Sequence, residues 1–322
     1  MSLVSDAQIE EPRAKPRWKW TDIVMAVLVV VGLFILVRLL GDVGFTTIWD
    51  QLRSAEPVWL VLGLLAAQLM FLTQAVVLRG ASAVQIPWKP AIALQAALKV
   101  FGLTLPGSAS RVATDVQFLE NYDVKAPEAI LTASIEEAAR GISRIILLLA
   151  VLPFVDIELD GVSAPSLRTV LLVLGGIAVA AGVVAFIPRA RTVVSGLAAR
   201  IWTSIKILGG QQKRQIGILG GALATELVYA LALGCFAQAY DIGLSPVELI
   251  AVNTAGSMLA SVVPSPGGIG SAEAALTGSL VALGVPAETA FPIALTQRLG
   301  TQYLPPLWGL VCLQWLRRKS LL

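Results

Sequence analysis

The residues of this chain that could do chemistry are ionisable side chains set inside apolar segments. They are Lys99, Arg111, Asp115, Glu136, Glu137, Arg140, Arg144, Glu226, Glu273 and Arg298. Charges are expensive in lipid, so those that occur there tend to mark the path of a substrate or an ion. The forked donors of a guanidinium suit a phosphate in particular. These ten positions are therefore the candidates for a polar path through a membrane.

Other kinds of chemistry find no support in the composition. The chain has no histidine, which removes imidazole bases, imidazole metal ligands and histidine proton relays. Cys235 and Cys312 lie in apolar runs and are spaced neither for a metal nor for an obvious disulfide. No GxxxxGK[ST] loop is present, so we expect no ATP hydrolysis by this chain. We predict no catalytic residue, no cofactor, no metal and no nucleic-acid partner.

The stretch VVPSPGGIGSAEAAL interrupts an apolar region with two prolines and three glycines, and an acid follows. If Ser271 caps a new helix, Glu273 lies in its first turn and favours the helix dipole. A second interpretation is that the glycines let an anionic headgroup approach the N–H groups of the helix start. Glu273 would then orient a basic partner or contact a substrate amine. The glycines are Gly267, Gly268 and Gly270.

Arg298 and Lys99 are the basic residues deepest in apolar sequence. A buried Arg298 needs a counter-charge, and Glu273 or Glu226 can supply it. That pair would be structural only, or it would prepare the guanidinium for a phosphate. Lys99 either extends to the membrane surface or contacts a phosphate. Glu226 could be paired, protonated or coupled to proton movement.

Glu136, Arg140 and Arg144 follow one another at four-residue spacing, with Glu137 beside them. This spacing places the three on one stripe of a helix. They form ion pairs on a helix end that projects into the cytoplasm, or they form the polar wall of an inward-facing cavity. The sequence leaves both open.

The chain is 56% hydrophobic and 14% charged, whereas soluble domains carry about a quarter charged residues. Long uninterrupted apolar runs favour membrane helices over a barrel. We therefore predict an all-α polytopic membrane protein with a single transmembrane domain over 21–316. The expected full spans are 21–40, 57–78, 128–153, 167–188, 216–240 and 289–315.

Basic residues predict the orientation, because they gather in cytoplasmic connections. They lie in the segment 1–20, the connection 188–215 and the tail 317–322, so both termini should be cytoplasmic. The segment 1–20 precedes a run long enough to span, unlike a cleaved signal peptide. Residues about 189–213 form an amphipathic helix on the inner leaflet or extend two spans.

The number of membrane crossings agrees with the predicted sides of the connections only if two broken segments enter the membrane and return to the same side. They are about 90–106, from the cytoplasm, and about 246–284, from outside. Opposed broken helices are typical of inverted-topology repeats, whose substrate site lies near mid-membrane.

Three motifs carry a resemblance to a known family: LTLPGSASR with FLENYDV, then VVPSPGGIGSAEAAL, then TQRLGTQYLPPLWG. They resemble the lysylphosphatidylglycerol synthase transmembrane-domain family, also called flippase-like, over about residues 90–313. The most specific part is Pro264–Glu273 together with Arg298. No segment resembles the aminoacyl-transferase domain of full synthases, so we expect a stand-alone member. The resemblance implies a lipid translocase.

The sequence departs from the family pattern at two places. Family members commonly carry a Gly-Glu pair after the first Pro-Gly and an arginine three residues later, where this chain has Ser110, Arg111 and Thr114. They often carry Glu-Arg where this chain has Glu136 and Glu137. Both differences concern the identity of the substrate more than the fold.

We therefore predict a flippase or scramblase in a bacterial inner membrane, not an enzyme. A phospholipid or glycolipid headgroup would pass a path lined by Lys99, Arg111, Arg140, Glu273 and Arg298. The net charge of +3 favours an anionic lipid. A secondary transporter of a small anion and an accessory subunit of a lipid-modifying complex are the alternatives. The sequence also allows a homo-oligomer or a lipid-modifying enzyme as partner.

Overall fold

The structure is a computed structural model that describes residues 53, 55–104, 108–155, 212–262 and 270–322. Every regular element within these ranges is a helix, which confirms the all-α prediction for this part of the chain. Several predicted features lie outside the described residues: the segment 1–20, the spans 21–40 and 167–188, nearly all of the stretch 189–213, Gly267 and Gly268.

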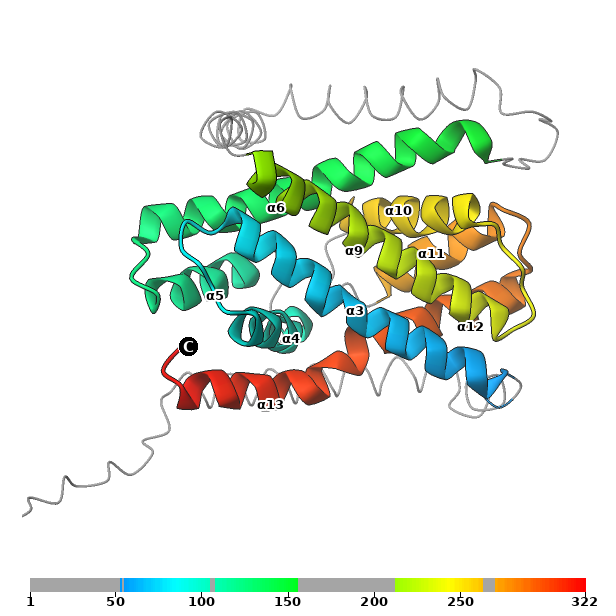
Figure 1. Ribbon diagram of the computed structural model, residues 1–322. Helices are drawn as coiled ribbons and strands as arrows, with labels where there is room; N and C mark the ends of the chain where they lie inside the picture. Colours follow the sequence, from blue (N-terminus) through cyan, green and yellow to red (C-terminus); the bar gives the residue numbers. More distant parts are fainter. Residues whose placement is uncertain (1–52, 54, 105–107, 156–211, 263–269) are drawn as a thin grey trace, which may run out of the picture.

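The described helices form two blocks with the same order of elements (Figure 1). Each block begins with a long helix, continues with a medium and a short helix, and ends with a long helical segment. The first block contains α3 (Pro57–Ala81), α4 (Trp88–Thr104), α5 (Ser108–Glu120) and α6 (Ala126–Val151), which the 3-10 turn η1 (Leu152–Phe154) extends. The second contains α9 (Gln212–Gln238), α10 (Pro246–Val262), α11 (Ser271–Val281), α12 (Ala287–Arg298), the π-helix η3 (Leu299–Tyr303) and α13 (Pro305–Arg318).

The first helices of the two blocks, α3 and α9, pack side by side and run antiparallel. Gly63, early in α3, lies against Phe236, late in α9, whereas Gly80 at the other end of α3 lies against Ile218. A Cβ on Gly63 would come within 2.6 Å of the Phe236 ring, so glycine permits this approach. Close approach matters in lipid, where helices associate by packing because lipid tails are as apolar as leucine.

The final segment of each block packs on the first two helices of the other block. α6 packs on α9 and α10 of the other block, and in the same way η3 packs on α3 while α13 packs on α4. Corresponding contacts around an antiparallel pair are compatible with the predicted inverted-topology repeat. The inverted topology and the re-entry of 90–106 and 246–284 into a bilayer both stay predictions, because helix contacts alone define no membrane direction.

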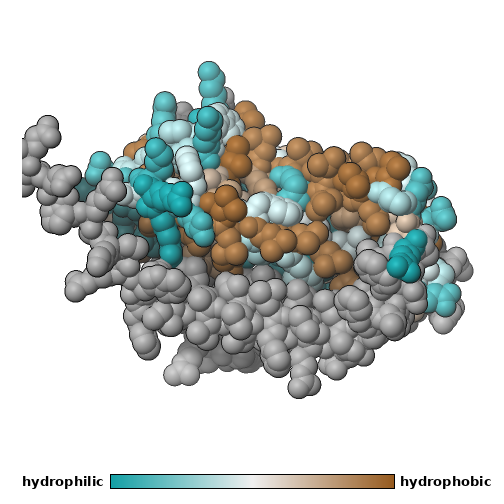
Figure 2. All heavy atoms as spheres, turned by 90° about the horizontal axis from the view of Figure 1, so that it is seen from below, coloured by the Kyte–Doolittle hydropathy of each residue, from teal (hydrophilic) through white to brown (hydrophobic). Residues whose placement is uncertain are grey.

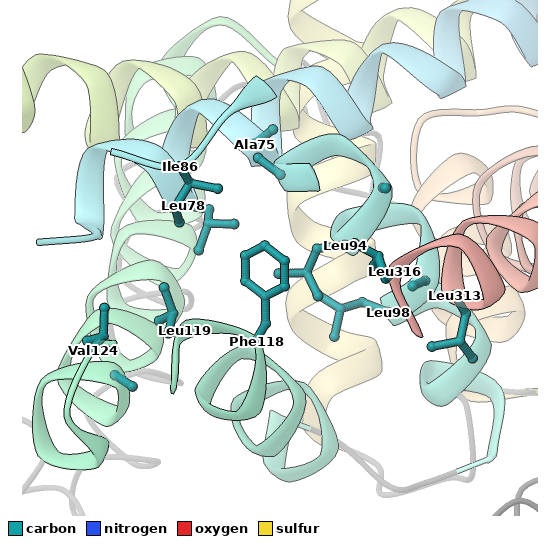
Figure 3. Packing of buried hydrophobic residues seen from close by; sticks show 14 residues of the cluster. Ala75, Leu78, Ile86, Leu94, Leu98, Phe118, Leu119, Val124, Leu313 and Leu316 are labelled. Carbon is teal, nitrogen blue, oxygen red and sulfur yellow. The ribbon is translucent and has the colours of Figure 1, made fainter. Parts of the chain in front are cut away.

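The apolar cluster in Figure 3 joins α3, α4, α5 and α13. Phe118 of α5 is fully buried, and so are Leu94 of α4 and Leu316 of α13. Native cores are as dense as organic crystals, so this packing fixes the helices against one another. It thereby sets the positions of Lys99 on α4 and Arg111 on α5.

Two of the described helices are long and apolar enough to cross a membrane, over Pro57–Ala81 and Lys213–Gln238. On α3, the side chains of Val58, Val61 and Leu65 are more than half exposed. Figure 2 shows apolar side chains over much of one face, with hydrophilic ones gathered toward its ends. A surface of this kind suits contact with lipid.

The segment predicted as one span over 289–315 is divided in the structure. α12 ends at Arg298, η3 follows, and α13 begins at Pro305. Pro305 and Pro306 lack N–H donors and fit the first turn of a new helix, where no donor is needed. The division lets α12 pack on α11 while α13 packs on α4 of the other block.

Candidate functional site

Glu273 closes the start of α11. The chain enters this helix at Gly270, whose φ of +82° favours glycine, and the Gly270 N–H donates to Glu273 Oε2 at 2.7 Å. A carboxylate in this position satisfies an N–H that the helix leaves unpaired and complements the dipole. The predicted cap at Ser271 is wrong, because Gly270 precedes the helix and Ser271 is its first residue.

The same carboxylate is also an ion-pair partner. Arg298 Nε donates to Glu273 Oε1 at 3.2 Å, and the Tyr303 hydroxyl donates to the same oxygen. Only 8% of the Glu273 side chain is exposed. Glu273 and Glu226 were the two predicted counter-charges for Arg298, and in the structure Arg298 pairs with Glu273. Capping and pairing, two separate interpretations of the sequence, therefore occur together.

The π-helix η3 explains how Arg298 and Tyr303 reach one carboxylate. Residues five positions apart in an α-helix point about 140° away from each other. In η3 the Leu304 N–H instead donates to the carbonyl of Leu299, five residues earlier, at 2.9 Å. This wider turn brings Arg298 and Tyr303 to one side, with the guanidinium carbon 5.5 Å from the centre of the ring.

Glu226 of α9 connects three helices. Arg144 of α6 donates from Nε to Glu226 Oε1 at 2.8 Å, and Asn253 of α10 donates to Oε2 at 3.1 Å. The glutamate is 2% exposed. Both of its oxygens are satisfied, so Glu226 is paired and holds Arg144 in place.

A cavity of about 260 Å³ lies where the two blocks meet. Its wall contains three cations from three helices, Lys99 of α4, Arg144 of α6 and Arg298 of α12. Tyr229 of α9 and Asn253 of α10 also line it. Small-molecule sites measure roughly 300–1,000 Å³. The cavity therefore has room for a small polar group rather than for a whole lipid.

Lys99 is the cation of this wall that has no carboxylate partner among the described residues. Its Nζ donates to the Tyr229 hydroxyl at 3.4 Å and lies 5.8 Å from the centre of that ring. Gln74 Nε2 donates to the same hydroxyl at 3.2 Å. An ammonium group that is partly buried without a counter-charge costs free energy. An anion in the cavity would therefore be stabilised there.

A second group of charges lies on α5 and α6, which pack against each other. Its members are Arg111, Asp115, Glu136, Glu137 and Arg140. Arg140 donates to Glu137 Oε2 at 2.6 Å, while Glu136 Oε2 lies 3.8 Å from both Arg111 and Arg140. Of the i,i+4 ion pairs predicted for this stripe, the one between Glu136 and Arg140 is present, whereas Arg144 turns to Glu226.

Residues 23–309 match the family model described as the lysylphosphatidylglycerol synthase TM region. This range is most of the 322-residue chain. The chain belongs to that family. The resemblance predicted from the motifs is thereby confirmed, and membership makes this a membrane protein with a lipid-related role. A comparison with curated proteins gives no match.

The structure explains one departure from the pattern of the lysylphosphatidylglycerol synthase TM family. In the second block, the acid Glu273 on the short helix α11 faces the base Arg298 on α12. In the first block, the base Arg111 on the short helix α5 faces the acid Glu136 on α6. The basic residue after the first Pro-Gly therefore comes with a partner of opposite charge, and the two blocks carry ion pairs of reversed polarity.

The predicted site residues divide into two places. Lys99 and Arg298 line the cavity, and Glu273 and Glu226 hold arginines of its wall. The cluster on α5 and α6 contains Arg111, Arg140, Glu136 and Glu137. Gly270 lies at the start of α11, and Gly267 and Gly268 lie outside the described residues.

Sequence reasoning missed three residues of these sites, because Tyr229, Asn253 and Tyr303 were not singled out. It named Arg144 as part of a possible polar wall but left it out of the predicted headgroup path. Asn253 had a usable signal, because an amide in an apolar helix needs a partner. Tyr303 had none, since its contact depends on the π-helical turn.

Proposed function

We propose that this protein moves a lipid with a phosphate-bearing headgroup between the two leaflets of the membrane. The headgroup passes through the cavity where the two blocks meet, and the acyl chains stay in the bilayer. The observation that carries this proposal is the wall formed by Lys99, Arg144 and Arg298. Family membership supports a lipid as the substrate.

The charges around the cavity favour an anion. Glu226 and Glu273 neutralise the two arginines, which leaves the positive charge of Lys99 uncompensated among the described residues. A phosphate would supply the missing negative charge and accept hydrogen bonds from Lys99 and from guanidinium groups. A zwitterionic or neutral headgroup without phosphate gains none of this.

The arginines are held in a way that suits phosphate binding. Arg144 and Arg298 each donate to their carboxylate through Nε, the inner nitrogen of the guanidinium. The two terminal nitrogens of Arg144 have no hydrogen bond to the described part of the chain. Glu226 thus fixes the guanidinium plane while these donors stay available to a ligand.

Gln74 connects the cavity to the cluster on α5 and α6. Its amide nitrogen donates to Tyr229, and its oxygen accepts from Arg111 at 3.5 Å. We therefore include Arg111 and Arg140 in the path of the headgroup, as a second set of cations beyond the first. The proposal keeps an inner-membrane location, cytoplasmic termini, transport without ATP hydrolysis and no enzymatic activity, on the basis of the sequence.

The test is lipid exchange in liposomes that contain the purified protein and a phospholipid with a fluorescent headgroup. A membrane-impermeant quencher then reports how fast the label moves from the inner to the outer leaflet. We expect the protein to speed this movement and Lys99→Gln to slow it. Equal rates with and without protein would reject the proposal.

The matched control is Lys89→Gln, which removes an exposed lysine from the first turn of the same helix and should leave the rate unchanged. A second arm distinguishes lipid from soluble phosphate. Liposomes with the same protein density are given radiolabelled inorganic phosphate. Uptake of phosphate without lipid exchange would replace the lipid translocase with a transporter of a small anion.

A further inference from the structure

Asp115 and Glu136 are the two most deeply buried carboxyl groups among the described residues, and both contact Arg111. Asp115 is 1% exposed and Glu136 is fully buried. None of their four carboxylate oxygens has a hydrogen-bond partner in the described part of the chain. Their nearest cation contacts are ion pairs at 3.8 Å, with Arg111 for both and with Arg140 for Glu136. Native structures rarely leave buried carboxylates in this condition.

The acid of the other block shows what a satisfied carboxylate looks like in this fold. Glu273 accepts from the Gly270 N–H, from Arg298 and from the Tyr303 hydroxyl. Glu136, which faces the short helix α5 in the first block, accepts no hydrogen bond from the described residues. Glu273 therefore has the donors that a buried carboxylate needs, whereas Asp115 and Glu136 lack such donors among the described residues.

The surrounding charges leave this pair one positive charge short. The groups that face it are Arg111 on α5, Glu137 and Arg140 on α6, the uncharged Gln74 on α3 and Gln95 on α4, with Lys99 farther along α4. Arg140 donates a 2.6 Å hydrogen bond to Glu137, so Glu137 is its main partner. Arg111 therefore remains as the main cation for two carboxylates.

The amide nitrogen of Gln95, beside Arg111, is a second buried polar group that lacks a hydrogen-bond partner among the described residues. Gln95 is fully buried, and its oxygen accepts from Arg111 at 2.6 Å. Its amide nitrogen has no acceptor among the described residues. The site therefore contains an unpartnered donor as well as unpartnered acceptors, and the acceptors outnumber the donor.

We propose that Asp115 and Glu136 share one bound proton, and that this carboxyl pair is a proton-binding site of the protein. One proton makes one of the acids neutral and leaves one carboxylate for Arg111. Two buried carboxylates beside a single guanidinium seldom both ionise, because burial and their mutual repulsion disfavour the second charge.

If the proposed lipid movement is correct, this site gives it a response to a proton gradient. Gln74 bonds to Arg111, which contacts both acids, and to Tyr229, which contacts Lys99. Release of the proton adds a negative charge beside Arg111 and strengthens its ion pairs. The guanidinium then becomes less available to a lipid phosphate, so protonation favours passage of the headgroup. This step rests on the proposed function.

The proton itself is tested by infrared spectroscopy of the full-length protein, titrated in detergent. A protonated carboxyl group has a C=O band separate from that of carboxylates. We expect this band at neutral pH in the wild type, and its loss in Glu136→Gln and in Asp115→Asn, because the remaining acid then has Arg111 to itself. Glu128→Gln, at an exposed site on the same helix, should leave the band intact.

Glu137→Gln distinguishes a proton site from a merely structural cluster. It removes the partner of Arg140 and so gives Glu136 a second cation, which should weaken the band at a given pH. Absence of the band in the wild type, or its survival in both Glu136→Gln and Asp115→Asn, would overturn the proposal.

The transport consequence has a separate readout. A pH gradient should change the rate of lipid exchange in the wild type and not in Glu136→Gln. If exchange occurs but ignores the gradient, the coupling is wrong. If no exchange occurs, the lipid translocase fails, and the infrared result still decides the proton site.

Discussion

Removing one partner of the ion pair between Glu273 and Arg298 should destabilise the protein strongly, and Glu273→Gln is the change that tests this. Glutamine keeps an oxygen that can accept from the Gly270 N–H, so the helix cap survives. It removes the charge that faces Arg298 and the strong acceptor of the Tyr303 hydroxyl. The substitution therefore separates pairing from capping.

The expected loss follows from burial. Breaking a buried ion pair by removing one partner costs about 3–5 kcal/mol, because the other charge stays buried without its partner. Glu273 is 8% and Arg298 is 17% exposed, with Arg298 facing the cavity. The partial exposure of Arg298 softens the penalty, so we expect the lower end, about 3 kcal/mol, for Glu273→Gln.

The double variant Glu273→Gln/Arg298→Gln removes both charges and should be more stable than the two single losses predict. We expect a coupling free energy of about 2 kcal/mol, within the range for residues of one network. Equilibrium unfolding in mixed detergent micelles, followed by tryptophan fluorescence, gives all four free energies, since the chain has eight tryptophans.

Glu248→Gln provides the control for capping alone. Glu248 accepts from the Ser245 N–H at 2.6 Å at the start of α10 and takes part in no ion pair among the described residues. Its loss should be a few tenths of a kcal/mol. A cost for Glu273→Gln as small as that for Glu248→Gln, with additive effects in the double variant, would refute the role assigned to the pair.

Three further changes have defined outcomes. Gly309→Ala places a Cβ 2.5 Å from a carbonyl oxygen of α4 and should cost about 1–3 kcal/mol in unfolding assays, whereas Gly141→Ala meets nothing within 4 Å and should be neutral or stabilising. Glu226→Gln should lower the melting temperature yet tighten binding of anionic lipid in detergent, because Arg144 loses its carboxylate. Tyr229→Phe should weaken that binding, since the hydroxyl that holds Lys99 is gone.

Much of the fold was predictable because apolar runs and prolines act locally. The helices expected at 57–78, 128–153 and 216–240 occur as α3, α6 and α9, with ends shifted by a few residues. The prolines and glycines of 246–284 predicted two helical parts, and the structure has α10 and α11 on either side of residues 263–269, which lie outside the described part of the chain. The sequence analysis did not predict that the helix expected over 289–315 is divided, although Pro305 and Pro306 are a signal for the start of a new helix.

The sequence predicted which residues belong to the site, but it did not predict how they are arranged. The sequence identified Glu273, Arg298 and Glu226 as acids and bases that need partners, and all three are paired. It did not show that Glu226 belongs to Arg144, because the two lie 82 positions apart and meet only through the packing of α6 on α9. Local spacing predicts partners on one helix and gives no information on partners between helices.

An experimental structure of the protein in a nanodisc of anionic phospholipid would show directly whether a headgroup enters the cavity. We predict a lipid phosphate inside the cavity, within hydrogen-bond distance of Lys99 and of an arginine of its wall. Lys99→Gln, prepared in the same lipid, should lose that phosphate. A cavity that holds only water, with every lipid phosphate at the level of the headgroups, would contradict it.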